Sequence, residues 1–235
     1  MCKLFLIDKM VKNLLNLFFP RVCLACDHQM ESNELYVCTI CRHELPLTNF
    51  ESTTDNNITK MLYGRVLLRN TSALLRFSKK GLVQHLLHNL KYKGHEEIGE
   101  FLGKWHGEVL CKHEGFKSVD VVIPVPVHSK RLRQRGYNQV HKYGKELAQA
   151  LACDFNTEVL QKTKATKTQV FKDRIKRWIT DDALFVVTEF ETLKGKHILL
   201  VDDIITTGAT IEACGWKLKE IPGVRLSVAT MACTI

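Results

Sequence analysis

The feature that most constrains the fold is the stretch LLVDDIITTGAT at residues 199–210. An apolar run typical of a strand buried on both faces leads into two adjacent acids, Asp202 and Asp203. A loop of threonines with one glycine follows, and the next residues have helical spacing. This order predicts an α/β protein with a parallel sheet, whose carboxyl edge carries the acids and the loop and binds the ligand.

The rest of the chain alternates between strand-like and helix-like segments, as a parallel sheet with crossover helices requires. The 235 residues suit one such domain with a small appendage. One predicted helix stops at Lys93-Gly94, a typical C-terminal signal. We predict helices at 82–92, 96–110, 138–151 and 209–218, and strands at 118–127, 159–160, 183–187, 197–201 and 225–231.

The threonine loop has the chemistry of an anion site. Free backbone N–H groups and the positive dipole end at a helix N-terminus favour phosphate. The hydroxyls of Thr206, Thr207 and Thr210 add donors. The two carboxylates beside the loop fit as acceptors for sugar hydroxyls or as ligands of Mg²⁺. The motif therefore predicts a sugar-phosphate site, and the alternative is a threonine-capped turn with solvated acids.

The segment VDDIITTGAT resembles the ribose-phosphate motif of type I phosphoribosyltransferases. The resemblance implies that Asp202 and Asp203 contact the ribose 2′- and 3′-hydroxyls of phosphoribosyl pyrophosphate (PRPP). It also implies that Mg²⁺ bridges the ribose and the pyrophosphate. The cradle for the 5′-phosphate would be Thr206, Thr207, Gly208, Ala209 and Thr210.

A second anion site is expected in VVIPVPVHSKRLRQRGYNQV, residues 121–140. Four cations follow the strand directly, on what we predict to be a loop: Lys130, Arg131, Arg133 and Arg135. They suit a pyrophosphate group or a nucleic-acid backbone, and the alternative is a solvated basic face. We assign Lys130, Arg131 and Arg135 to the pyrophosphate loop.

Four of the nine cysteines form two Cys-x-x-Cys knuckles, which are Cys23 with Cys26 and Cys38 with Cys41. Two such knuckles let four thiolates converge tetrahedrally on one Zn²⁺. The alternatives are ordinary core thiols or a redox pair, and His28 and His43 are substitute ligands. A closed set of four ligands predicts a structural zinc module, with a role in stability or in binding a partner.

The sequences RGYNQ at 135–139 and LLHNLKYKG at 86–94, with the four cysteines, resemble the late competence protein F (ComF-like) family. That family couples a zinc module to a phosphoribosyltransferase-like domain and takes part in DNA uptake during natural transformation. The resemblance implies a cytoplasmic protein beside a helicase-like ATPase at the inner face of the membrane. It also assigns Gln169 and Arg174 to a mobile loop over the substrate, although Trp178 stands near where the family has Asn.

Residues 161–178 carry seven Lys or Arg against one Asp, with Phe171 and Trp178 among them. Charge combined with aromatic stacking predicts binding of single-stranded DNA, and the alternative is a solvated loop. The formal net charge of +9 agrees with an anionic partner.

The N-terminal residues are apolar but interrupted by charges such as Lys3, Asp8 and Lys12, so we expect no membrane span. Residues 11–19 have the spacing of a short amphipathic helix. We therefore divide the chain into this helix plus a zinc ribbon at 1–47, a polar linker at 48–60, and a phosphoribosyltransferase-like domain at 61–235.

Two hypotheses of function follow. The first is a DNA-uptake factor that binds PRPP and single-stranded DNA. The second is an active phosphoribosyltransferase that displaces pyrophosphate at the anomeric carbon in favour of an acceptor that the sequence does not identify.

Overall fold

The computed structural model describes residues 20–49, 56–162 and 185–234. Several predicted features lie outside these ranges. They are the amphipathic helix at 11–19, residues 50–55 of the linker, the loop residues Gln169 and Arg174, and residues 163–178 of the basic segment.

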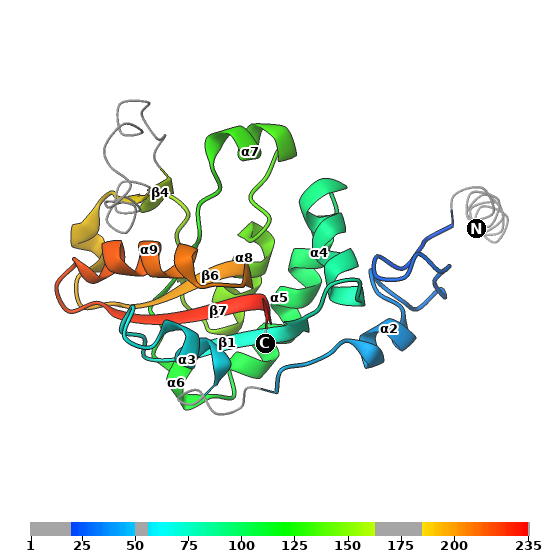
Figure 1. The fold of residues 1–235 in the computed structure, drawn as a ribbon, viewed down its shortest axis with the longest axis horizontal. Helices are drawn as coiled ribbons and strands as arrows, with labels where there is room; N and C mark the ends of the chain where they lie inside the picture. Colours follow the sequence, from blue (N-terminus) through cyan, green and yellow to red (C-terminus); the bar gives the residue numbers. More distant parts are fainter. Residues whose placement is uncertain (1–19, 50–55, 163–184, 235) are drawn as a thin grey trace, which may run out of the picture.

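A five-stranded sheet forms the centre of the molecule (Figure 1). All neighbouring strands in it are parallel, which confirms the predicted fold class. In spatial order the strands are β1 (Thr71–Phe77), β7 (Arg225–Thr234), β6 (His197–Ile205), β2 (Val121–Pro124) and β3 (Asp154–Phe155).

Helices cover both faces of the sheet because its central strands are apolar on both sides. Leu199 and Val201 of β6 pack into one hydrophobic cluster with α4 (Leu82–Tyr92), α5 (Glu97–Leu110) and α8 (His141–Ala150). Ile198 and Leu200 pack into the other cluster, with α3 (Asn57–Leu62) and α9 (Ala209–Lys219). The alternation of strand side chains thus divides the core into two layers.

The shorter elements lie around this frame. They are the helices α2 (Thr39–Glu44), α6 (Glu114–Lys117) and α7 (Ser129–Arg135), the 3-10 turn η4 (Phe190–Leu193), and an antiparallel pair of β4 (Leu160–Lys162) and β5 (Phe185–Val187). None of the helices in the described ranges combines the length and apolar character that crossing a bilayer requires.

Among the differences from the sequence-based expectation, three lie close to the predicted site or linker. Strand β6 continues to Ile205, which pairs with Cys233 of β7, so both acids lie within the strand rather than after it. Residues 129–135 form helix α7 instead of a loop, and this helix ends at Gly136 in the left-handed conformation. Helix α3 occupies residues 57–62, so the C-terminal end of the predicted linker is helical.

Candidate functional site

A cavity of about 420 Å³ opens where β2 and β6 end, and it brings both predicted anion sites together. The predicted ribose and phosphate residues Asp202, Asp203 and Thr210 lie on one wall. The other wall carries the predicted pyrophosphate residues Lys130, Arg131 and Arg135, from α7. Arg133 is not among the residues that line the cavity.

Asp203 is held in place by two side chains. Its Oδ1 accepts from Lys91 Nζ at 2.9 Å, and its Oδ2 accepts from Gln139 Nε2 at 2.7 Å. The Asp203 side chain is 7% exposed. A nearly buried carboxylate is stable only when its charge is compensated, and Lys91 supplies that charge.

The surroundings of Asp202 shift the pKa of its carboxyl group strongly. Burial, together with the charge of neighbouring Asp203, raises the pKa of Asp202 to about 8. The backbone N–H of Asp203 and the cations Lys91 and Lys162 act in the opposite direction without outweighing burial. A perturbed acid in a cavity rich in cations is typical of a functional site.

The threonine loop encloses a small hollow of about 30 Å³, lined by backbone and side chains of residues 204–211 and by Asp202. Gly208 lies at its centre with φ of +76°, and a Cβ there would meet Leu62 Cδ2 at 2.7 Å. Helix α9 starts at Ala209, so its N-terminal N–H groups face this loop. The predicted cradle residues are therefore contiguous and lie at a helix N-terminus.

Arg65, which follows helix α3, holds the threonine loop through side-chain hydrogen bonds. Its Nη1 donates to the carbonyl oxygen of Thr207 at 2.6 Å, and its Nε donates to Glu212 Oε2, in the first turn of α9, at 2.9 Å. The loop is thus bound to the segment that follows α3 as well as to its own helix.

The sequence analysis gave no individual role to Arg65, Lys91 or Gln139, and it counted Lys162 only as part of the basic segment at 161–178. Lys91 and Gln139 fall inside LLHNLKYKG and RGYNQ, which were noted only as family signatures. Arg135 Nη1 donates to Gln139 Oε1 at 2.8 Å, and Gln139 donates in turn to Asp203. The RGYNQ signature therefore contains a relay from the cationic helix to the acidic pair.

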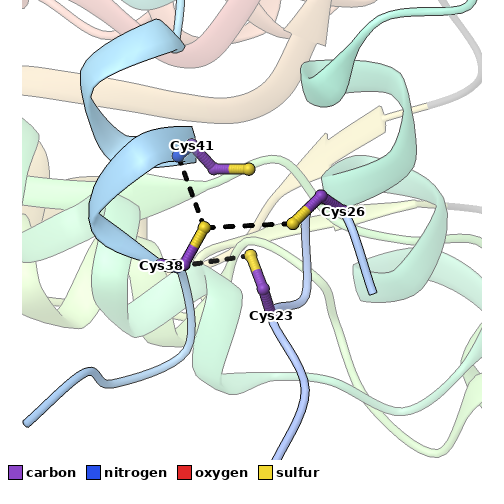
Figure 2. Close-up of side chains that lie close together, drawn as sticks. All are labelled: Cys23, Cys26, Cys38 and Cys41. Atoms are coloured by element: carbon purple, nitrogen blue, oxygen red, sulfur yellow. Dashed lines mark hydrogen bonds between the residues drawn. The ribbon is translucent and has the colours of Figure 1, made fainter. Parts of the chain in front are cut away.

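The four cysteines form a compact cluster between the turn at residues 23–26 and helix α2 (Figure 2). Their sulfur atoms all lie within 4.8 Å of one another, and Cys26 Sγ and Cys38 Sγ are 3.9 Å apart. Tetrahedral Zn²⁺ with thiolate bonds of about 2.3 Å places its ligands about 3.8 Å apart. The cluster thus has the donor set and spacing of a metal site.

Backbone N–H groups also point at the sulfur atoms. The N–H of Cys38 donates to Cys23 Sγ at 3.2 Å, and the N–H of Cys41 donates to Cys38 Sγ at 3.4 Å. Burial opposes ionisation of Cys23, but its N–H donors, that of Cys38 foremost, outweigh this effect and lower the pKa of the thiol. These donors favour the thiolate of Cys23, the form that binds metal, whereas burial raises the pKa of Cys26 and of Cys41.

A scan against family models matches the phosphoribosyl transferase domain to residues 114–232, just over half of the chain. The chain therefore belongs to the phosphoribosyl transferase domain family, in agreement with the parallel sheet and the cavity at its carboxyl edge.

The chain is also similar to curated proteins that are named for DNA utilization or for competence. The DNA utilization protein YhgH of Escherichia coli O157:H7 is 32% identical over 130 residues, 54% of this chain and 56% of the relative. Competence protein ComFC of Bacillus subtilis is 22% identical over 201 residues, 85% of this chain and 78% of the relative. Competence protein F of Haemophilus influenzae is 30% identical over 108 residues, 45% of this chain and 46% of the relative.

The predicted resemblance to competence proteins is confirmed by these homologues. The chain spans about half the length of the YhgH proteins that it matches. Among solved structures, adenine phosphoribosyltransferase from Saccharomyces cerevisiae aligns at 20% identity and a TM-score of 0.37, over 63% of this chain and 73% of that one.

Proposed function

We propose that this chain is a competence-type protein of DNA uptake that binds PRPP with Mg²⁺ in the 420 Å³ cavity. The observation that carries the proposal is that an acidic pair and a cationic helix line one cavity, and that the threonine loop adjoins it, because Asp202, Ile204 and Thr210 line both this cavity and the hollow of the loop. Each group matches one part of PRPP, which has a ribose, a 5′-phosphate and a pyrophosphate. The names of the competence homologues support the cellular role.

In this proposal Asp202 and Asp203 accept hydrogen bonds from the ribose hydroxyls. Residues 206–210 bind the 5′-phosphate through their backbone N–H groups and hydroxyls. Lys130, Arg131 and Arg135 bind the pyrophosphate, and Gln169 and Arg174 cover the ligand. Mg²⁺, when bound, neutralises charge on the pyrophosphate, and carboxylates are its preferred protein ligands.

The test is isothermal titration of PRPP with Mg²⁺ into the wild type and into the Asp202→Asn/Asp203→Asn variant. Wild type is expected to bind in the micromolar range, about −8 kcal/mol, and the variant is expected not to bind. Asp154→Asn with Glu191→Gln is the matched control, because both of these carboxylates are exposed and outside the cavity. No heat from the wild type would refute the proposal.

The same proposal includes single-stranded DNA and a helicase-like ATPase as partners in the cytoplasm, at the inner face of the membrane. The net charge of +9 supports a nucleic-acid partner, as does Lys162, which lines the cavity where the basic segment begins. Neutralising the cations of residues 161–178 should weaken DNA binding and flatten its salt dependence. An unchanged salt slope would exclude this segment as the DNA site.

An active phosphoribosyltransferase is the second candidate, favoured by the family match and by the presence of both acids. Its test is pyrophosphate release from PRPP in the presence of candidate acceptors, with Asp202→Asn/Asp203→Asn as the inactive control. Release that is equal in the two proteins would refute this candidate.

We also propose that the four-cysteine cluster holds one structural Zn²⁺. The four-sulfur donor set and its spacing support this assignment.

A further inference from the structure

Helix α4 lies beside the N-terminal segment that carries the cysteines (Figure 1). Its residues contact both that segment, through Asn89, and the cavity, through Lys91. On one side, Asn89 Nδ2 donates to the carbonyl oxygen of Leu24 at 2.9 Å. His85 Nδ1 lies 2.9 Å from the carbonyl oxygen of Ala25. Both carbonyls belong to the knuckle between Cys23 and Cys26, so α4 is hydrogen-bonded directly to this knuckle.

The other side of α4 reaches the acidic pair. Lys91 lies two residues after Asn89, which places it about 200° around the helix axis. Its Nζ pairs with Asp203 Oδ1 at 2.9 Å, and its side chain is 20% exposed. From His85 to Lys91 the helix rises only about 9 Å. A short, rigid element therefore spans the distance between the knuckle and the proposed ribose site.

The contact between α4 and the cysteine module is part of the hydrophobic core and not a contact at the surface. One hydrophobic cluster contains three of the cysteines together with three leucines of α4, namely Cys23, Cys38, Cys41, Leu86, Leu87 and Leu90. Asn89 itself is 2% exposed. Loosening the knuckle would expose one face of α4 to water, and this would weaken the packing that fixes the end of the helix.

We propose that α4 couples the four-cysteine module (residues 21–47) to the cavity: an intact module holds Lys91 against Asp203 and so raises the affinity for PRPP. Lys91 is a positioning residue in this scheme, and Asn89 and His85 are the anchors of its helix. The inference rests on the proposed function, because PRPP is the ligand whose affinity is coupled.

The physical reason for the gain is preorganisation. The ion pair with Lys91 holds the Asp203 carboxylate in one orientation before the ligand arrives, which lowers the cost of ordering it on binding. Lys91 also neutralises one of two adjacent acids in a cavity that must accept a polyanion. Without its anchors, the end of α4 would move and both effects would weaken.

The first test is the PRPP·Mg²⁺ affinity of Asn89→Ala against Gln84→Ala. Gln84 is an exposed residue of the same helix, and its side chain accepts from the backbone N–H of Lys80, just before the start of the helix, rather than from the knuckle. We expect about five-fold weaker binding or more in Asn89→Ala, unchanged binding in Gln84→Ala, and an unchanged metal content in both. Equal affinity in the two variants would overturn the coupling.

Asn89→Ala should still fold, because it also removes Oδ1, a buried oxygen without a hydrogen-bond partner among the described residues. If it does not fold, His85→Ala takes its place and is expected to weaken PRPP binding in the same direction. His85 is only half-buried, so its removal leaves the core intact.

The second test uses reciprocity, since a coupling between two sites acts equally in both directions. Saturating PRPP·Mg²⁺ should slow the release of zinc to a chelator in the wild type but not in Lys91→Met. The Asp202→Asn/Asp203→Asn variant controls for chelation of zinc by PRPP itself. PRPP binding with an unchanged release rate overturns the coupling and leaves the proposed function standing, whereas no binding to the wild type overturns both.

Discussion

At the scale of single residues, the main feature is that Asp203 already has a partner for each of its carboxylate oxygens. Lys91 and Asp203 are separated by 112 positions in the chain. Sequence reasoning found Asp203 because the strand, acids and loop are contiguous. It could not find Lys91, because no local pattern reveals an ion pair between distant segments.

The Lys91–Asp203 pair leads to the first prediction. Lys91→Met should weaken PRPP·Mg²⁺ binding about ten-fold or more, because a nearly buried carboxylate loses its counter-charge. Lys93→Met removes the same charge from an exposed residue two positions away and should change affinity by less than about two-fold. Titration calorimetry of the two variants compares them directly, and equal effects would mean that only net charge matters.

His106 leads to the second prediction. It lies buried between Ser72 and Tyr143, with its Nε2 2.8 Å from Ser72 Oγ and its Nδ1 2.6 Å from the Tyr143 hydroxyl. Burial, with a smaller contribution from His113, lowers the pKa of His106 from 6.5 to about 3. The residue is therefore neutral in the folded protein at pH values where it is protonated in the unfolded chain.

Because the folded pKa is the lower one, the unfolded state binds more protons between about pH 3 and 6.5, and stability falls as the pH falls. The slope is about 1.4 kcal/mol per pH unit, so His106 should cost about 2 kcal/mol at pH 5 relative to pH 7. Urea unfolding at both pH values, with His106→Gln as the comparison, measures this. The variant should lose about that much less on acidification, and identical pH dependence in the two proteins would contradict the prediction.

At the scale of elements, strand β1 shows where sequence reasoning failed. Its sequence TSALLRF contains Ala, Leu and Arg, which favour helices, and it has no alternation because its first five residues are all buried. Pairing with β7 along most of its length overrides that preference. Long-range pairing decided this element, so the sequence alone gave no signal for it.

Helix α7 is a different case, because its sequence did contain the signal. SKRLRQR is made mostly of good helix formers, and Gly136 follows in the left-handed conformation that ends many helices. The sequence analysis placed these cations directly after a strand, on a predicted loop. The structure places Lys130, Arg131 and Arg135 at the cavity from a helix instead.

The threonine loop leads to the third prediction. Gly208→Ala should cost about 1–2 kcal/mol for the positive φ and should also abolish PRPP binding, because the new methyl group would meet Leu62 and displace the loop. Gly64→Ala is the matched control, with φ of +72° and open space around the new Cβ. It should lose similar stability but keep binding. Denaturant unfolding and calorimetry separate the two effects, and retained binding in Gly208→Ala would contradict the prediction.

At the scale of the whole molecule, the sequence analysis predicted both the parallel sheet and the four-cysteine cluster. It expected the cluster to form a small appendage beside the main domain. In the structure the cysteines share a hydrophobic cluster with α4 and α5. The Arg42 guanidinium also lies 5.4 Å from the ring centroid of Trp105, on α5. Contacts between segments so far apart in the chain depend on the folded core, which local sequence patterns do not encode.

These contacts lead to the fourth prediction. Zinc removal by a chelator should lower the melting temperature and change the fluorescence of Trp105, since the module that carries Arg42 loses its fixed geometry. Metal analysis should find one zinc per chain in the wild type and in Cys111→Ser, whose thiol is outside the cluster, but none in Cys38→Ser. Full zinc in Cys38→Ser would refute the four-thiolate site.

The position of β7 has a consequence for biosynthesis. This strand follows every other strand of the sheet in the chain, yet it lies between β1 and β6 and pairs with both. When the ribosome has made the chain up to β6, the single strand β1 and the three strands β6, β2 and β3 therefore still lack the strand that joins them. We expect the nascent chain to need protection from aggregation until β7 emerges, because unpaired strand edges and apolar faces stay open until then.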